Sequence, residues 1–339
     1  MKTFKLVQLI VWLLIIAFLV TVLVLFVLGK TNFSFFMKNE KQIELLQQTE
    51  NVNEITGIKF DLHSTDVVIK PSDSGEISIN YRGPESLKDK VDLDVSVIDG
   101  QLTITQDSPM RNWFFGMWNF TSRILVVTLP ESYADDLIIG NTSGDLTITG
   151  DYTIANFTSS LTSGDVNVEE ILCSDFHLDS TSGDVTLGSV AAQDLDISLT
   201  SGQIDAKELK GDGSIGTISG DIRVGSLTGN VQISATSGDV TVSALSGSGS
   251  VTCSSGDIGV TVAASSGDLS IKTTSGSVSV MLGKDSAYQI AAHCTSGDVS
   301  ANFPLTYSDG NNDASGLFGN TAANILKINT TAGDIKLAA

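Results

Sequence analysis

The chain is poor in basic residues and in cysteine. It has 19 Lys and Arg against 39 Asp and Glu, and its formal net charge is −20. A surface of this sign repels a phosphate backbone, which argues against nucleic acid as a partner. The three cysteines, Cys173, Cys253 and Cys294, lie far apart and show no C-x-x-C spacing. They predict neither a disulfide framework nor a metal site.

The sequence also lacks a long helical period after residue 55. Short runs of alternating apolar and polar residues, such as "GEISINY" and "RILVVTLP", are each bounded by Gly, Pro, Asp or Ser. Such runs are typical of strands. A hydrophobic content of 41% is enough for a substantial core. We therefore expect a domain built almost entirely of β-strands.

One apolar run stands apart, from Leu6 to Leu28, with lysines on both sides. Its length predicts a helix that crosses a bilayer. A cleaved signal peptide, ending near Val27 and Gly29, is the alternative, although its apolar stretch is usually only about 7 to 15 residues long. A short basic start tends to stay in the cytosol. We expect a single-pass protein of the cell membrane, with its C-terminal domain extracytoplasmic.

The motif T-S-G-D recurs through the last two thirds of the chain. Its glycines follow one another at steps of 18 to 21 residues until the last step, which is longer: Gly144, Gly164, Gly183, Gly202, Gly220, Gly238, Gly256, Gly276, Gly297 and Gly333. A fixed period of this size indicates a solenoid. At about 4.8 Å per stacked strand, ten coils predict a rod on the order of 50 Å long.

Apolar residues alternate with polar ones on both sides of each motif glycine. Before Gly202 they are Leu195, Ile197 and Leu199, and after Gly183 they are Val185 and Leu187. A further apolar residue follows at the seventh position, as in Val190, Leu209 and Leu227. The pattern predicts two strands per coil with apolar inward faces. Each coil buries its apolar face only when it stacks on its neighbours.

In this geometry S-G-D is a corner, because Gly accepts a positive φ and Ser and Asp bond nearby backbone N–H groups. We expect each Asp to bond its own turn. A ladder that holds Ca²⁺ is the alternative, although Gln203 and Ser277 interrupt it. The candidate ligands of that metal site are Asp145, Asp165, Asp184, Asp221, Asp239 and Asp257.

Two segments depart from the repeat. "RNWFFGMWNF", from Arg111 to Phe120, is rich in aromatic residues. It predicts either a cover for the membrane-proximal end of the solenoid or a contact with lipid or a membrane partner. The candidate interaction residues are Trp113, Phe114, Phe115 and Trp118. "FPLTYSDGNNDASGLFGN" predicts a surface loop or a second cap, after which "INTTAGDIKL" closes the rod.

Other apparent motifs carry little chemistry. "GDGSIG", Gly211 to Gly216, matches a dinucleotide pattern, but it lies within the β repeat and no helix is expected after it. His63, His177 and His293 accompany different strands, and no nucleophile-elbow pattern accompanies them. No catalytic residue and no cofactor is predicted.

The chain divides into four parts: a short cytoplasmic start with the anchor (1–29), a helical or flexible spacer (30–51), N-terminal strands with the aromatic cap (52–130), and the T-S-G-D solenoid (131–339). The strands "STDVVIKP" and "GEISINY", the ending "VTLP" and the copies of "TSGDLTI" up to "TTAGDIKL" resemble the bacterial putative-adhesin family of unknown function. The likeness covers about residues 52 to 339. It implies a single-stranded β-helix in a membrane-anchored envelope protein.

The resemblance implies adhesion without defining a ligand. We expect a non-catalytic surface module that contacts cell-wall polymer or an envelope protein. An accessory of envelope-stress signalling, acting through the anchor and the aromatic segment, is the alternative. A polysaccharide-acting enzyme fits less well, because it needs clustered carboxylates beside basic residues. The basic side chains of the repeat are scattered: Lys207, Lys210, Arg223 and Lys272.

Overall fold

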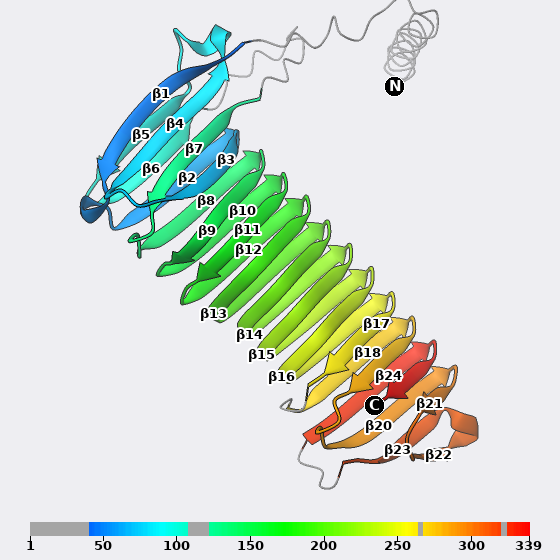
Figure 1. The fold of residues 1–339 in the computed structure, drawn as a ribbon. Coiled ribbons are helices and arrows are strands. Elements are labelled where there is room, and N and C mark those ends of the chain that lie inside the picture. Colours follow the sequence, from blue (N-terminus) through cyan, green and yellow to red (C-terminus); the bar gives the residue numbers. More distant parts are fainter. Residues whose placement is uncertain (1–40, 108–121, 264–266, 320–323) are drawn as a thin grey trace, which may run out of the picture.

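The structure, a computed structural model, describes residues 41–107, 122–263, 267–319 and 324–339. It is a long rod of β-strands (Figure 1), with only three short 3-10 helices among the described residues, η2 (Val52–Glu54), η3 (Glu85–Leu87) and η4 (Asp309–Asn311). The expected all-β solenoid is confirmed.

The strands of the N-terminal end are β1 (Gln42–Asn51), β2 (Gly57–Ser64), β3 (Asp66–Ser72), β4 (Glu76–Pro84), β5 (Leu93–Ile98), β6 (Gln101–Gln106) and β7 (Ile124–Pro130). The middle holds β8 (Asp136–Ser143), β9 (Leu146–Thr153), β10 (Asn156–Ser163), β11 (Val166–Leu172), β12 (Asp175–Ser182), β13 (Val185–Ser201), β14 (Ile204–Ser219), β15 (Ile222–Ser237), β16 (Val240–Ser255) and β17 (Ile258–Val262). The C-terminal end holds β18 (Leu269–Ser275), β19 (Val278–Leu282), β20 (Tyr288–Ser296), β21 (Val299–Ala301), β22 (Thr306–Ser308), β23 (Asp313–Phe318), β24 (Asn324–Ala332) and β25 (Ile335–Ala338).

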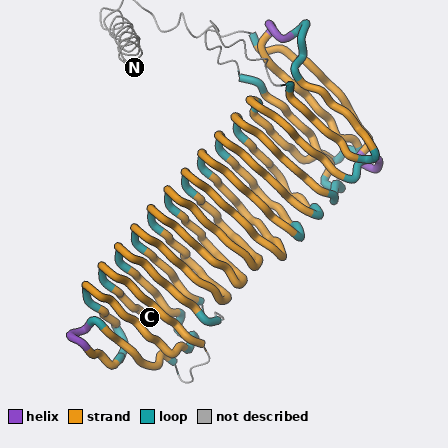
Figure 2. Tube along the Cα trace, turned by 180° about the vertical axis from the view of Figure 1, so that it is seen from behind, coloured by secondary structure: helices purple, strands orange, loops and turns teal. Residues whose placement is uncertain are grey.

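Each coil contributes one strand to each of two faces, and parallel pairing joins neighbouring coils in register. The face before the S-G-D corner, which we call the first face, includes β8, β10 and β12. The face after the corner, the second face, includes β9 and β11. The long strands β13 to β16 each pass from the second face of one coil to the first face of the next. The tube in Figure 2 shows the turns of successive coils aligned along the rod.

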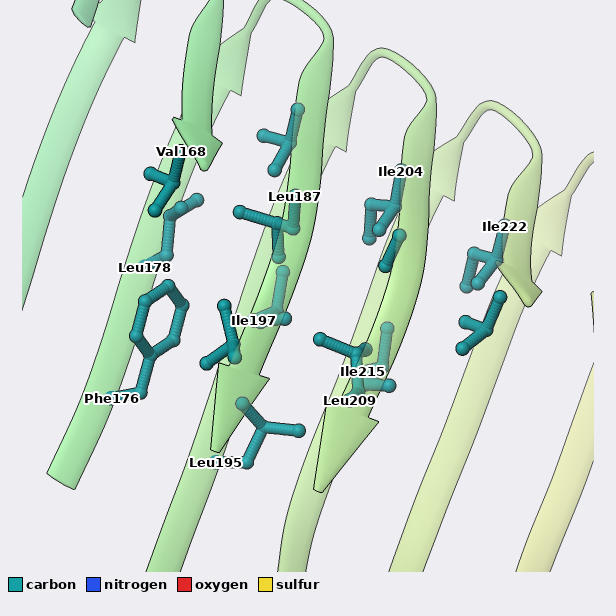
Figure 3. Close-up of a cluster of buried hydrophobic side chains, with 14 of the residues drawn as sticks. Val168, Phe176, Leu178, Leu187, Leu195, Ile197, Ile204, Leu209, Ile215 and Ile222 are labelled. Carbon is teal, nitrogen blue, oxygen red and sulfur yellow. The ribbon is translucent and has the colours of Figure 1, made fainter. Parts of the chain in front are cut away.

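The core runs along the axis of the rod, between the two faces. The predicted inward residues are buried, among them Leu195, Ile197, Val185 and Val190. In Figure 3, residues from successive coils, such as Ile204 and Ile222, lie in register in one apolar column. Because each residue packs on its counterparts above and below, no coil has a core of its own.

The N-terminal end is built differently from the middle. β6 and β7 stack outside β2 and β3, so that the coil of residues 57–72 lies between them and the coil of β8 and β9. Antiparallel strands then extend this end, with β5 on β6, β4 on β7 and β1 on β4. The prediction of a spacer over residues 30–51 is therefore wrong for Gln42–Asn51. β1 is an edge strand whose side chains are half-buried or exposed, so its apolar pattern is weak.

The C-terminal end also departs from sequence order. β24 lies between β18 and β20, and β25 lies between β19 and β21 (Figure 1). The expectation that "INTTAGDIKL" closes the rod is wrong, because this segment enters the stack one coil before the end. The inserted segment forms β22 and β23, and β23 pairs antiparallel with the outer edge of β20. Of the two alternatives predicted for it, the structure shows the cap.

Two predictions concern residues outside the described ranges. The apolar run from Leu6 to Leu28 and the aromatic residues Trp113, Phe114, Phe115 and Trp118 belong to segments that the structure does not describe. Within residues 41–107, 122–263, 267–319 and 324–339, no helix is long and apolar enough to cross a bilayer.

Candidate functional site

The S-G-D corners form one edge of the rod, and close backbone contact between coils determines their sequence. Gly220 has φ +143°, and a Cβ at this position would lie 2.0 Å from the carbonyl oxygen of Gly202. The same contact recurs between Gly202 and Gly183. Glycine is required twice over, by the backbone angle and by the stacking of one corner on the next.

The motif carboxylates join neighbouring corners. Oδ1 of Asp145 accepts the backbone N–H of Asp165 at 2.9 Å, and Oδ1 of Asp165 accepts that of Asp184 at 2.8 Å. Asp221, Asp239 and Asp257 continue the pattern in later coils. The expectation that each Asp bonds its own turn is wrong, because the carboxylate reaches the next coil. A backbone N–H that lies between successive carboxylates offsets part of their mutual repulsion.

The calcium ladder stays a prediction. One oxygen of each of the six candidate ligands is already bonded to a backbone N–H: Asp145, Asp165, Asp184, Asp221, Asp239 and Asp257. Arg223 also donates to Oδ2 of Asp221 at 2.6 Å. Over the described ranges, no group of three or more His, Cys, Asp or Glu side chains is placed to hold a metal ion.

The histidines lie apart from one another. His177 contacts Asp179 at 2.8 Å and Asp196 at 3.3 Å on the first face. A serine nucleophile requires a base such as an imidazole within hydrogen-bond reach. The Ser214 hydroxyl bonds the Asp196 carboxylate and not the imidazole of His177. His293 contacts Asp313 at 2.7 Å near the C-terminal end.

All three cysteines are free and buried. Burial raises the pKa of the Cys173 thiol from 9.0 to about 11. Cys253 and Cys294 lie in one file with two threonines between them, Thr273 and Thr330, because β24 enters the stack. The repeat period alone would place only Thr273 between them, and the entry of β24 adds Thr330. Both thiols donate to a glycine carbonyl, Cys253 to Gly238 and Cys294 to Gly297.

A polar network holds the two ends of the aromatic segment. Oε1 of the buried Gln106, at the end of β6, accepts the backbone N–H groups of His63 and Ser64. Nε of Arg123, just before β7, lies 3.0 Å from a carboxylate oxygen of Asp92. These contacts fix the points at which the chain leaves and rejoins the outermost coil, although the aromatic residues themselves lie outside the described ranges.

Among the described residues, three open depressions lie on the outward surface, and sequence reasoning missed all three. One of about 440 Å³ lies on the second face of the middle coils, and Glu169, Gly188, Asp205 and Lys207 line it. Another, of about 340 Å³, lies farther along the same face beside Asp239 and Asp257. The third, also about 340 Å³, lies on the first face near the C-terminal end. No periodic signal identifies them, because each arises where a small residue or an added strand interrupts the surface.

Comparison with known proteins identifies one family. The sequence profile of the Toastrack DUF4097 family matches residues 55–244 and 225–338. No curated protein matches the chain. Among solved structures, a putative cell adhesion protein from Clostridium sporogenes is 14% identical, with a TM-score of 0.25, over 88% of this chain and 99% of that chain. A putative adhesin from Parabacteroides merdae is 15% identical, with a TM-score of 0.37, over 73% of this chain and 98% of that chain. TM-scores this low support no conclusion about function.

Proposed function

Because the chain belongs to the Toastrack DUF4097 family, we propose that it is a non-catalytic, adhesin-type interaction module of a cell envelope. In this proposal the run from Leu6 to Leu28 anchors the chain in the membrane, and the β-solenoid projects outside. Its binding partner is a polymer of the envelope.

The proposal rests on the regular outward surface of the rod. Files of polar side chains run from coil to coil, for example Asn167, Thr186 and Asp205 on the second face. Stacked repeats present an extended surface of this kind to a long partner. A linear polymer fits such a surface better than a small molecule, which usually takes an enclosed and mostly apolar pocket.

Binding to wall polymer tests this function. Full-length protein in lipid nanodiscs would be sedimented with purified, delipidated cell wall, and empty nanodiscs would serve as the control. We expect the protein to sediment with the wall and to release no reducing sugar from it. Failure to sediment would contradict the interaction role, whereas release of reducing ends would contradict its non-catalytic character. Capture of a membrane sensor without any binding to the wall would favour the signalling alternative.

A further inference from the structure

We propose that the depression on the first face at the C-terminal end is a binding site for a carboxylate-bearing sugar of an envelope glycan. The site is formed by β24, β20 and β23, and we call it the distal grid. This inference rests on the proposed function and deepens it, because it assigns a place and a ligand class to the contact.

The charge of the rod changes sharply along its length. Residues 131–268 contain twenty acidic and only three basic side chains, whereas residues 269–339 contain five acidic and four basic ones. An anionic polymer is repelled along the middle of the rod and meets much weaker repulsion at the C-terminal end. The end that lies farther along the chain from the proposed anchor is thus the part of the solenoid that such a polymer can approach.

The distal grid is a regular array of outward side chains. In one file, Ala291 pairs in register with Lys327 on one side and with Ser315 on the other. In the next file, His293 lies in the same way between Asn329 and Asp313. All six of these residues line the depression of about 340 Å³. The small side chain of Ala291 forms its floor, while longer side chains form its rim.

The inserted cap strand completes this array. β23 pairs antiparallel with β20 and brings Asp313 and Ser315 next to His293 and Ala291. Nδ1 of His293 lies 2.7 Å from Oδ1 of Asp313, and this contact joins the two side chains on the rim. At this position the inserted strand, and not a further coil of the repeat, supplies the outer side of the site, so Asp313 and Ser315 reach it only through the insertion.

These side chains suit an acidic sugar. Lys327 is exposed, and its side chain forms no ion pair or hydrogen bond with the described residues, so its ammonium group is available to a carboxylate. Asn329 and Ser315 each offer both a donor and an acceptor for ring hydroxyls. The methyl group of Ala291 can contact the apolar face of a pyranose ring. One site therefore provides a charge, hydroxyl partners and a flat apolar floor.

The other two depressions lack this combination. Glu169 and Asp205 line the larger one, and Asp239 and Asp257 line the other one on the second face. In each of them two carboxylates outnumber the one lysine, Lys207 or Lys336, and repel an acidic sugar. The distal grid has one carboxylate, Asp313, which His293 contacts, beside Lys327. The distal grid is therefore the one of these three sites that we assign to an acidic ligand.

Binding of tetragalacturonate tests the site directly. The full chain in nanodiscs would be titrated with this oligosaccharide, with neutral maltotetraose and with short glycerol-phosphate chains, and binding would be followed by thermophoresis. We expect tetragalacturonate to bind and maltotetraose to bind at least tenfold more weakly. Lys327→Gln should weaken the binding of tetragalacturonate about tenfold, because it removes the one cation of the grid.

Lys336→Gln is the matched control. It makes the same charge change in the same coil but on the second face, and it should alter the affinity less than twofold. Equal weakening by both variants would overturn the assigned site, because the contact would then be a general charge effect. Stronger binding of glycerol phosphate would overturn the carboxylate class. If the wild type sediments with wall polymer and does not bind tetragalacturonate, the distal grid proposal fails and the proposed function stands. Loss of both kinds of binding contradicts both.

Discussion

The middle of the rod and its two ends follow different rules. From β10 to β19, each coil stacks on the coil that precedes it in sequence, and the corner contacts repeat almost unchanged. At the ends, the stacking order departs from the sequence order, and antiparallel strands cover the outer edges of β6, β7 and β20. The repeat is sufficient to extend a solenoid, but a terminal coil otherwise leaves apolar core and unpaired backbone groups open to water. The departures at both ends supply that cover.

A corner glycine in the middle should give the largest effect. Gly220→Ala places a Cβ 2.0 Å from a backbone carbonyl at a positive φ. We expect it to destabilise the protein by about 3 kcal/mol or more. Gly259→Ala is the control, because its Cβ would find only a side-chain oxygen at 3.9 Å. Chemical denaturation of the two variants measures the difference, and equal midpoints would contradict the close contact of the corners.

Removal of core volume separates the two regions. Ile328→Ala, in the intercalated β24, and Ile233→Ala, in the middle, both truncate buried side chains, and each should cost about 2 to 4 kcal/mol. Ile328→Ala should speed hydrogen exchange in β20 and β24 while β12 stays protected. Ile233→Ala should instead weaken the regular stack. Identical exchange profiles for the two variants would show that the ends and the middle unfold as one unit.

The bonds between corner carboxylates and the next coil should have a smaller effect. Asp239→Ala leaves the backbone N–H of Asp257 without its partner at 2.8 Å. We expect a loss of about 1 to 2 kcal/mol. Asp239→Asn keeps an acceptor in the same place and should lose less. Thermal melts of both variants compare them, and a greater loss in the Asn variant would mean that charge, not the hydrogen bond, stabilises the corner.

The rate of thiol labelling reports local opening. In variants that keep a single cysteine, Cys294 in β20 should react faster than Cys253 in β16, because the end coil opens more easily than the middle. Burial raises the pKa of both thiols, so both rates should increase as the pH rises and thiolate forms. Faster labelling of Cys253 would reverse the expected order of stability.

Calcium should have the smallest effect. We expect the melting temperature of the full chain to stay unchanged between calcium and a chelator, because each candidate carboxylate already bonds a backbone N–H. The double variant Asp239→Asn with Asp257→Asn should behave in the same way. A rise in melting temperature with calcium that is smaller in the double variant would show instead that the corner carboxylates bind calcium.

The sequence predicted the middle of the rod much better than the ends. The period located the corner glycines, and the alternation located inward residues such as Ile197 and Val185, since both are set by contacts that recur in every coil. The order in which the coils stack leaves no recurring pattern in the sequence. Every coil shares the same inward pattern, so β24 can pair equally well with β18 or with β20. The distal grid was missed for the same reason, because it joins β20 to an inserted strand.

The intercalated coil bears on how such a rod can change length during evolution. Residues 324–338 lie between two coils that both precede them in the chain, so both edges of their strands are already paired. A repeat added after these residues would therefore have no free strand edge of this coil on which to stack. A duplicated coil fits without conflict between β8 and β19, where each new unit meets the same neighbours as the old one. Longer and shorter relatives should therefore differ by whole coils in the middle and keep both ends intact.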